Sequence, residues 1–98
     1  MANKEIIWSL RAKQELKDVL DFFTKRNGNS KYSLKILSEI EDLTETLSKS
    51  EFIGRLTSNK TTRVIPMKDY LLFYDVNKNR VEILSFWDNR QNPKNRLI

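Results

Sequence analysis

The stretch that decides the fold is Tyr70-Leu71-Leu72-Phe73-Tyr74-Asp75-Val76-Asn77-Lys78-Asn79-Arg80-Val81-Glu82-Ile83-Leu84-Ser85-Phe86-Trp87. It holds two runs of aliphatic and aromatic residues, 70–76 and 80–87, on either side of the polar triplet 77–79. Runs of this composition that flank a short polar segment are typical of two β-strands joined by a turn. We therefore predict an antiparallel β-hairpin at this point of the chain.

A third strand candidate precedes the hairpin. Residues 61–65 are rich in β-branched side chains, and the turn-like segment 66–69 separates them from the hairpin. Three candidates spaced this closely predict a three-stranded antiparallel meander. Because side chains alternate along a strand, Arg63 is expected to point away from the face that Val64 occupies.

The N-terminal part begins with a short strand and continues as a helix. Residues 5–8 are β-branched and aromatic, which predicts a strand, and Ser9 follows as a candidate N-cap. Apolar side chains then recur every three or four residues, as on one face of a helix, at Ala12, Leu16, Val19, Leu20 and Phe23. We predict that this helix ends at residues 27–29, where Gly28 can adopt the left-handed conformation of a C-terminal cap.

A second helix is predicted to begin near Asn29 or Ser30 and to close at residues 48–50, because its apolar positions keep the helical period. The short break between the two helices favours an antiparallel helical hairpin. The order is then one strand, two helices and three strands. This order predicts a single α+β domain over residues 1–98, in which the helical hairpin covers one face of the sheet.

The composition excludes several kinds of chemistry. The chain contains neither cysteine nor histidine, so disulfides and Ser-His or Cys-His nucleophilic pairs are excluded, and we expect no metal site and no cofactor. No apolar run approaches the roughly 18 residues that a membrane span needs. The N-terminus also lacks the apolar region of a secretory signal. We therefore expect a cytoplasmic protein without a membrane partner.

The charge is unevenly distributed. Residues 1–54 hold as many acidic as basic side chains, so residues 55–98 carry the whole net charge of +5. A basic half beside a neutral half indicates an anionic partner, most simply a nucleic acid, although ordinary surface lysines give the same balance. We expect the sheet face opposite the helices to collect Arg63, side chains of the last strand and the polar tail, and so to bind an anionic ligand.

The chain resembles the RelE/ParE superfamily of toxins from bacterial type II toxin–antitoxin systems. The resemblance covers nearly the whole length and rests on the order and spacing of its segments. These segments are Trp8-Ser9-Leu10-Arg11-Ala12, the helical hairpin, Arg63-Val64-Ile65, residues 70–76 and Val81-Glu82-Ile83-Leu84-Ser85-Phe86-Trp87-Asp88-Asn89-Arg90-Gln91-Asn92-Pro93.

The resemblance implies a toxin with one of two targets. RelE-like members enter the ribosome and cleave messenger RNA with basic side chains on the concave sheet face. ParE-like members inhibit DNA gyrase and have lost most of those side chains. Both kinds are neutralised by a cognate antitoxin protein, so the resemblance implies an antitoxin partner and either gyrase or the ribosome with its mRNA as the target.

The residues that carry RelE-type cleavage are only partly present. Arg63 and Arg90 match basic positions of the ribonucleases and are the tentative catalytic residues, which would act by stabilising phosphate charge. However, Leu71 stands where the ribonucleases carry an arginine, and Arg96 stands where they carry a tyrosine. We therefore favour a gyrase inhibitor or a toxin with an unassigned target. The alternatives are a ribosome-dependent mRNA endoribonuclease and an inactive antitoxin-binding module.

The candidate residues for target or nucleic-acid binding are Lys60, Lys68, Tyr70, Lys94 and Arg96. Each also has a structural interpretation: the lysines and Arg96 can be solvated surface charges, and Tyr70 can belong to the edge of the core. Phe86 and Trp87 are expected to pack in the core rather than to stack on a base. Arg90 has a structural alternative as well, in which it ties the tail to Asp88.

Overall fold

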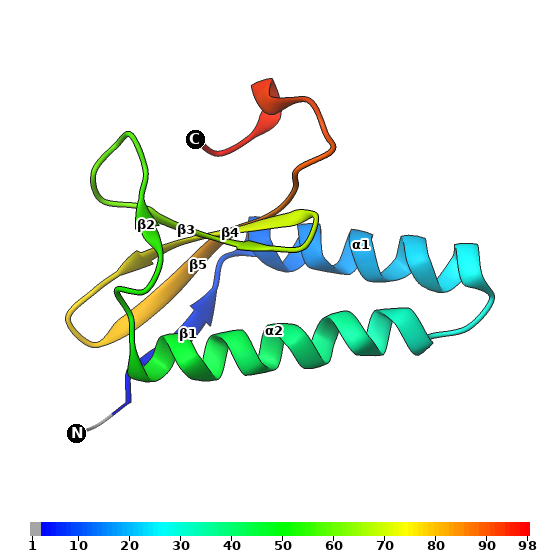
Figure 1. Cartoon of the computed structure of the whole chain (residues 1–98), viewed down its shortest axis with the longest axis horizontal. Coiled ribbons are helices and arrows are strands. Elements are labelled where there is room, and N and C mark those ends of the chain that lie inside the picture. Colours follow the sequence, from blue (N-terminus) through cyan, green and yellow to red (C-terminus); the bar gives the residue numbers. More distant parts are fainter. Residues whose placement is uncertain (1–2) are drawn as a thin grey trace.

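The computed structural model describes residues 3–98 and has the α+β fold that the sequence predicts (Figure 1). Met1 and Ala2, which the predicted domain includes, lie outside the described residues. The elements are β1 (Glu5–Trp8), α1 (Leu10–Asn27), α2 (Lys31–Lys49), β2 (Arg55–Leu56), β3 (Arg63–Met67), β4 (Tyr70–Val76), β5 (Arg80–Asp88) and the 3-10 helix η1 (Pro93–Asn95).

The ends of the helical hairpin follow the predicted signals. The Ser9 hydroxyl accepts a hydrogen bond of 3.0 Å from the backbone N–H of Ala12, and thereby caps α1. Gly28 has φ +69° and donates its N–H to the carbonyl of Thr24, as in a left-handed C-terminal cap. The second helix begins at Lys31, one residue after the predicted start.

The sheet has the strand order β1-β5-β4-β3-β2. β1 runs parallel to β5, and the remaining neighbours pair antiparallel, which includes the predicted meander. The sequence prediction missed β2, because two residues are too few to show an alternating pattern. The predicted turn at 66–69 was wrong in its first half: Pro66 and Met67 extend β3, and proline is tolerated there because β3 is paired along only part of its outer edge.

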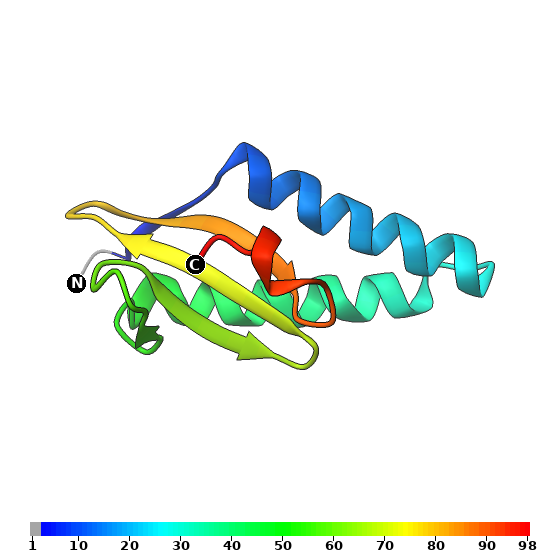
Figure 2. The same ribbon diagram turned by 90° about the horizontal axis from the view of Figure 1, so that it is seen from above.

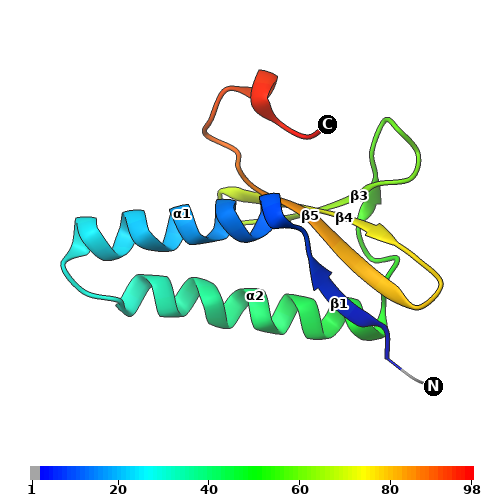
Figure 3. The same ribbon diagram turned by 180° about the vertical axis from the view of Figure 1, so that it is seen from behind.

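The helical hairpin covers one face of the sheet, and the C-terminal tail crosses the other (Figures 1 and 3). In the view from above, the tail lies over the central strands, α2 runs beneath the sheet, and α1 lies beside the edge formed by β1 and β5 (Figure 2). The main core lies between helices and sheet and consists of Ala12, Ile36, Ile40, Leu47, Tyr70, Leu72, Tyr74, Val81, Ile83 and Phe86. A smaller cluster of Val64, Phe73 and Trp87 lies on the tail side.

A bulge in β5 decides which aromatic side chain faces which cluster. Tyr74 pairs with Ile83 while Phe73 pairs with Ser85, so β5 advances two residues where β4 advances one. The bulge reverses the alternation after Ile83. Consequently Phe86 packs in the main core and Trp87 packs on the tail side, and both are buried as the sequence predicts.

Glu15 of α1 binds β5 directly after this bulge. Its carboxylate accepts hydrogen bonds from the Ser85 hydroxyl at 2.7 Å and from the Phe86 backbone N–H at 3.2 Å. β1 pairs with β5 only as far as Ile83, so the outer edge of β5 beyond that residue needs other acceptors, and a carboxylate is a strong one. The contact therefore ties α1 to the point where β5 changes its facing.

Replacing Glu15 with alanine is expected to lower the free energy of unfolding by about 2 kcal/mol, because the part-buried Ser85 hydroxyl and Phe86 N–H lose a charged acceptor. Urea denaturation measures this loss. Asp18→Ala, one turn further along α1, is the control: Asp18 is exposed and accepts a bond from only Gln14 among residues 3–98, so the change is expected to stay within about 0.5 kcal/mol. Equal losses in both variants would contradict the assigned role of Glu15.

Candidate functional site

The sheet face opposite the helices is apolar rather than polar. Its centre is formed by Val64, Phe73 and Trp87, against which Leu71 and the last two residues of the tail pack. The expectation that this face gathers basic strand residues for an anionic ligand is therefore not met at its centre. An apolar sheet face suits contact with protein side chains better than contact with phosphate.

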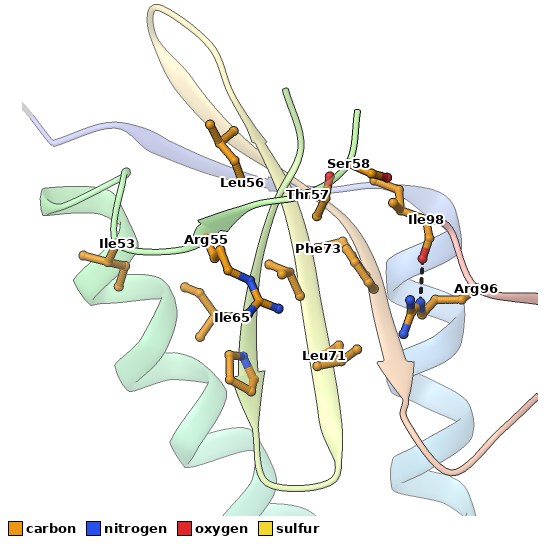
Figure 4. A pocket seen from close by; sticks show the side chains of 12 residues that line it. Ile53, Arg55, Leu56, Thr57, Ser58, Ile65, Leu71, Phe73, Arg96 and Ile98 are labelled. Carbon is orange, nitrogen blue, oxygen red and sulfur yellow. Dashed lines mark hydrogen bonds between the residues drawn. The ribbon is translucent and has the colours of Figure 1, made fainter. Parts of the chain in front are cut away.

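A groove of about 590 Å³ runs over this face between the segment around β2 and the tail (Figure 4). The floor consists of side chains from β3 and β4, and the walls come from residues 53–58 and from the tail. Arg55 and Arg96 are the charged side chains that line it, and no Asp or Glu side chain of residues 3–98 does so. The groove is thus apolar at its base and basic at its walls.

Arg63 lies on the other side of the sheet from this groove. Since Val64 and Phe73 face the tail, Arg63 faces the helix side together with its partner in the ladder, Tyr74. Its guanidinium donates a hydrogen bond of 2.7 Å to the carbonyl of Gly54 and lies over the Phe52 ring, 5.1 Å from the ring centroid. The prediction that Arg63 and the tail share one face was wrong. It placed Val64 on the helix-covered face of β3, whereas Val64 faces the tail and Arg63 faces the helices.

Arg90 follows β5 and is bound to the residue that ends that strand. Its guanidinium makes two hydrogen bonds to the Asp88 carboxylate, of 2.9 and 2.8 Å, and its backbone N–H donates a third. A second carboxylate, Asp69, lies 3.8 Å away. The bond from Arg90 lowers the pKa of the Asp88 carboxyl, and the same pairing raises the pKa of Arg90. This geometry matches the structural alternative, in which Arg90 ties the tail to Asp88.

The two tentative catalytic arginines do not converge. Arg63 pairs beside Tyr74, whereas the Arg90 guanidinium lies over the Tyr70 ring at the far end of β4, 5.8 Å from the ring centroid. Four residues along a strand span about 13 Å. Each guanidinium is held by its own local partners, Arg63 by the Gly54 carbonyl and Arg90 by Asp88, so the two do not meet at one point. The structure therefore does not bring the two tentative catalytic residues together.

Two of the binding candidates are engaged by the fold itself. Tyr70 is buried, with 2% of its surface exposed, and its ring stacks on Phe86 at 4.8 Å; burial raises the pKa of its phenol. Lys68 adopts φ +55° in the turn between β3 and β4 and forms an ion pair of 2.9 Å with Glu39 of α2. Both residues therefore contribute to packing between the sheet and the helices.

Of the other three candidates, one lies in the loop between β2 and β3, and two lie in the tail, where Arg96 lines the groove. Lys60 has φ +64° and lies in a loop fixed by Asn59, whose side-chain oxygen accepts the backbone N–H groups of Thr61 and Thr62. Lys94 is exposed on η1. Arg96 lies over the Phe73 ring, 6.0 Å from its centroid, and hydrogen-bonds to the tail backbone.

Sequence reasoning missed the segment that precedes and includes β2. Tyr74 donates its hydroxyl to the carbonyl of Glu51 at 2.9 Å and accepts the Gly54 N–H at 2.8 Å, and burial raises the pKa of this phenol. The segment 51–56 is thus held in place by hydrogen bonds from the side chains of Tyr74 and Arg63. The one available signal was Gly54, where a Cβ would lie 2.5 Å from the Tyr74 hydroxyl oxygen, so that a side chain would displace the ring.

Over residues 3–98, no helix is both long and apolar enough to cross a bilayer. Among the same residues, no three carboxylates lie close enough together to hold a metal ion. The site therefore consists of an apolar groove with arginine walls, a rigid segment at β2 and a tail that Arg90 ties to β5.

Comparison with known proteins agrees with the observed fold. A solved chain of the chromosomal ParDE toxin–antitoxin system from P. aeruginosa superposes with a TM-score of 0.71, covering 85% of this chain and 92% of that chain. Its sequence identity is 17%, so the likeness establishes the fold. None of the curated proteins compared with the chain matches it significantly.

A protein-family model matches most of the chain. Residues 6–93 match the family model described as the ParE toxin of the type II toxin–antitoxin system parDE. The match runs from β1 to the start of η1 and so includes every strand and both long helices. It confirms the resemblance to the RelE/ParE superfamily. The chain belongs to the family of ParE toxins of type II toxin–antitoxin systems.

Proposed function

We propose that this toxin arrests growth by inhibiting DNA gyrase in the cytoplasm and that a cognate antitoxin holds it inactive. The observation that carries the choice of target is the sheet face opposite the helices. Leu71, Val64 and Phe73 occupy it, and ribonucleases of the RelE type need basic side chains on that face. A gyrase inhibitor needs a protein-binding surface there instead.

Acid–base chemistry also argues against RNA cleavage. Attack by a 2′-hydroxyl requires a base, an acid and stabilisation of phosphate charge, and the chain has no histidine to shuttle protons. Arginine stays protonated near neutral pH and serves only the electrostatic part. Here Arg63 is bound to backbone carbonyls and Arg90 to Asp88, so their stabilisation of phosphate charge is weakened as well. Loss of one such donor costs about 10²–10³ in rate.

Induced expression is expected to stop growth and to leave messenger RNA uncleaved within translated frames. The purified protein is expected to inhibit supercoiling by purified gyrase, because inhibition of gyrase requires only binding. Primer extension on cellular messages and a plasmid supercoiling assay measure the two effects. Cleaved messages with normal supercoiling would identify an endoribonuclease instead. Growth that continues unchanged while the antitoxin still binds would identify an inactive binding module.

Arg90→Ala is expected to raise the inducer concentration that arrests growth by at least about tenfold. The reason is that the tail, which carries Lys94 and Arg96, loses its tie to β5. Asp88→Ala removes the same tie and leaves the cation in place. We expect the two variants to behave alike in a titration of inducer against growth rate. Loss of toxicity in Arg90→Ala alone would show instead that the guanidinium itself contacts the target.

A further inference from the structure

Exposed apolar side chains concentrate at one place on this protein. Phe52, Ile53 and Leu56 are 62%, 51% and 45% exposed and lie within five residues of one another, immediately before and within β2. The other large apolar residues of comparable exposure are spread over the helices, at Leu10, Phe22 and Leu34. Clustered exposure of this kind marks interaction surfaces, whereas scattered exposure is ordinary. We call residues 51–56 the β2 knuckle.

The β2 knuckle is rigid although it is exposed. The Tyr74 hydroxyl binds both the Glu51 carbonyl and the Gly54 N–H, and Gly54 packs directly on that ring. Arg63 donates to the Gly54 carbonyl and lies under the Phe52 ring. The buried Tyr74 and the half-buried Arg63 thus both hold this one exposed turn in its conformation. Pre-organised aromatic groups bind at a low entropic cost, which is the property of interface hot spots.

The charge around the β2 knuckle is positive. Glu51 is compensated by an ion pair of 3.5 Å with Lys4, while Arg55 is exposed and has no carboxylate within ion-pair distance among residues 3–98. Ile53, Arg55 and Leu56 also line the groove, so the knuckle borders it (Figure 4). An apolar surface beside uncompensated arginine favours a partner with an apolar pocket and a carboxylate rim.

We propose that the β2 knuckle is the surface by which this toxin binds its protein target, inserting Phe52 and Ile53 into an apolar pocket whose rim is acidic. Exposed side chains on a fixed turn suit a preformed pocket in a folded protein, because neither partner has to become ordered. Arg55 contacts the acidic rim, and Tyr74 and Arg63 are positioning residues. The inference deepens the proposed function, and gyrase is the folded partner used to test it.

The double variant Phe52→Ser/Ile53→Ser is expected to raise the toxin concentration for half-inhibition of purified gyrase by at least about tenfold, since hot-spot truncations cost that much or more. The matched control is Phe22→Ser/Leu34→Ser, which removes side chains that are 55% and 59% exposed on the helices. It is expected to inhibit like the original protein. Thermal melting of both variants establishes that each is folded at the assay temperature.

A charge-reversed pair tests the acidic rim. Arg55→Glu is expected to weaken inhibition more than tenfold, and Lys78→Glu, an equal change of charge at the exposed turn between β4 and β5, is expected to leave it unchanged. Tyr74→Phe removes only the hydroxyl that holds the knuckle, and is expected to weaken inhibition several-fold well below its melting temperature. Unaltered inhibition by the Phe52→Ser/Ile53→Ser variant would overturn the proposal.

The outcomes also separate this inference from the proposed target. If the original protein does not inhibit gyrase, the gyrase assignment fails, and the same variants are then measured by the inducer concentration that arrests growth. Loss of arrest in the knuckle variants and its retention in Phe22→Ser/Leu34→Ser would support the knuckle as the target-binding surface for whichever protein is bound. Equal arrest by all folded variants would overturn it.

Discussion

The sheet of this toxin has to bury two apolar faces with one short chain, and the rest of the structure depends on this constraint. β4 and β5 send aromatic and aliphatic side chains to both sides, and the helical hairpin is long enough to cover only one of them. The tail covers part of the second face, and the remainder stays open as the groove. Burial is the main favourable term in folding, so an apolar face left open in a small domain points to a binding partner.

The bulge of β5 decides how its aromatic side chains are divided between the two apolar faces. Without the bulge, strict alternation from Ile83 would place Trp87 toward the helices and Phe86 toward the tail. Directly after the bulge, Glu15 accepts hydrogen bonds from Ser85 and Phe86, from a helix some 70 residues away in sequence. One carboxylate thus connects the first helix, the facing of the last strand and the starting direction of the tail.

The arginines illustrate why a motif position does not by itself define a role. The resemblance implies that Arg63 and Arg90 stand at basic positions of RelE-type ribonucleases, yet each is satisfied by local partners: Arg63 by backbone carbonyls and Arg90 by Asp88. A guanidinium offers five donors in a fixed fork and therefore suits such structural bonds as well as it suits phosphate. In this chain the same residues stabilise the β2 knuckle and the tail, which are the parts proposed to meet the target.

The sequence by itself determined the elements and the family. Ser9, Gly28 and the apolar periods define the helices, and the runs at 70–76 and 80–87 define the central strands, because caps and periodicity are local properties. Only the tertiary structure decided which face each side chain occupies. Arg63 was assigned to the wrong face, and β2 was missed, since facing depends on packing against distant residues and a two-residue strand has no local pattern.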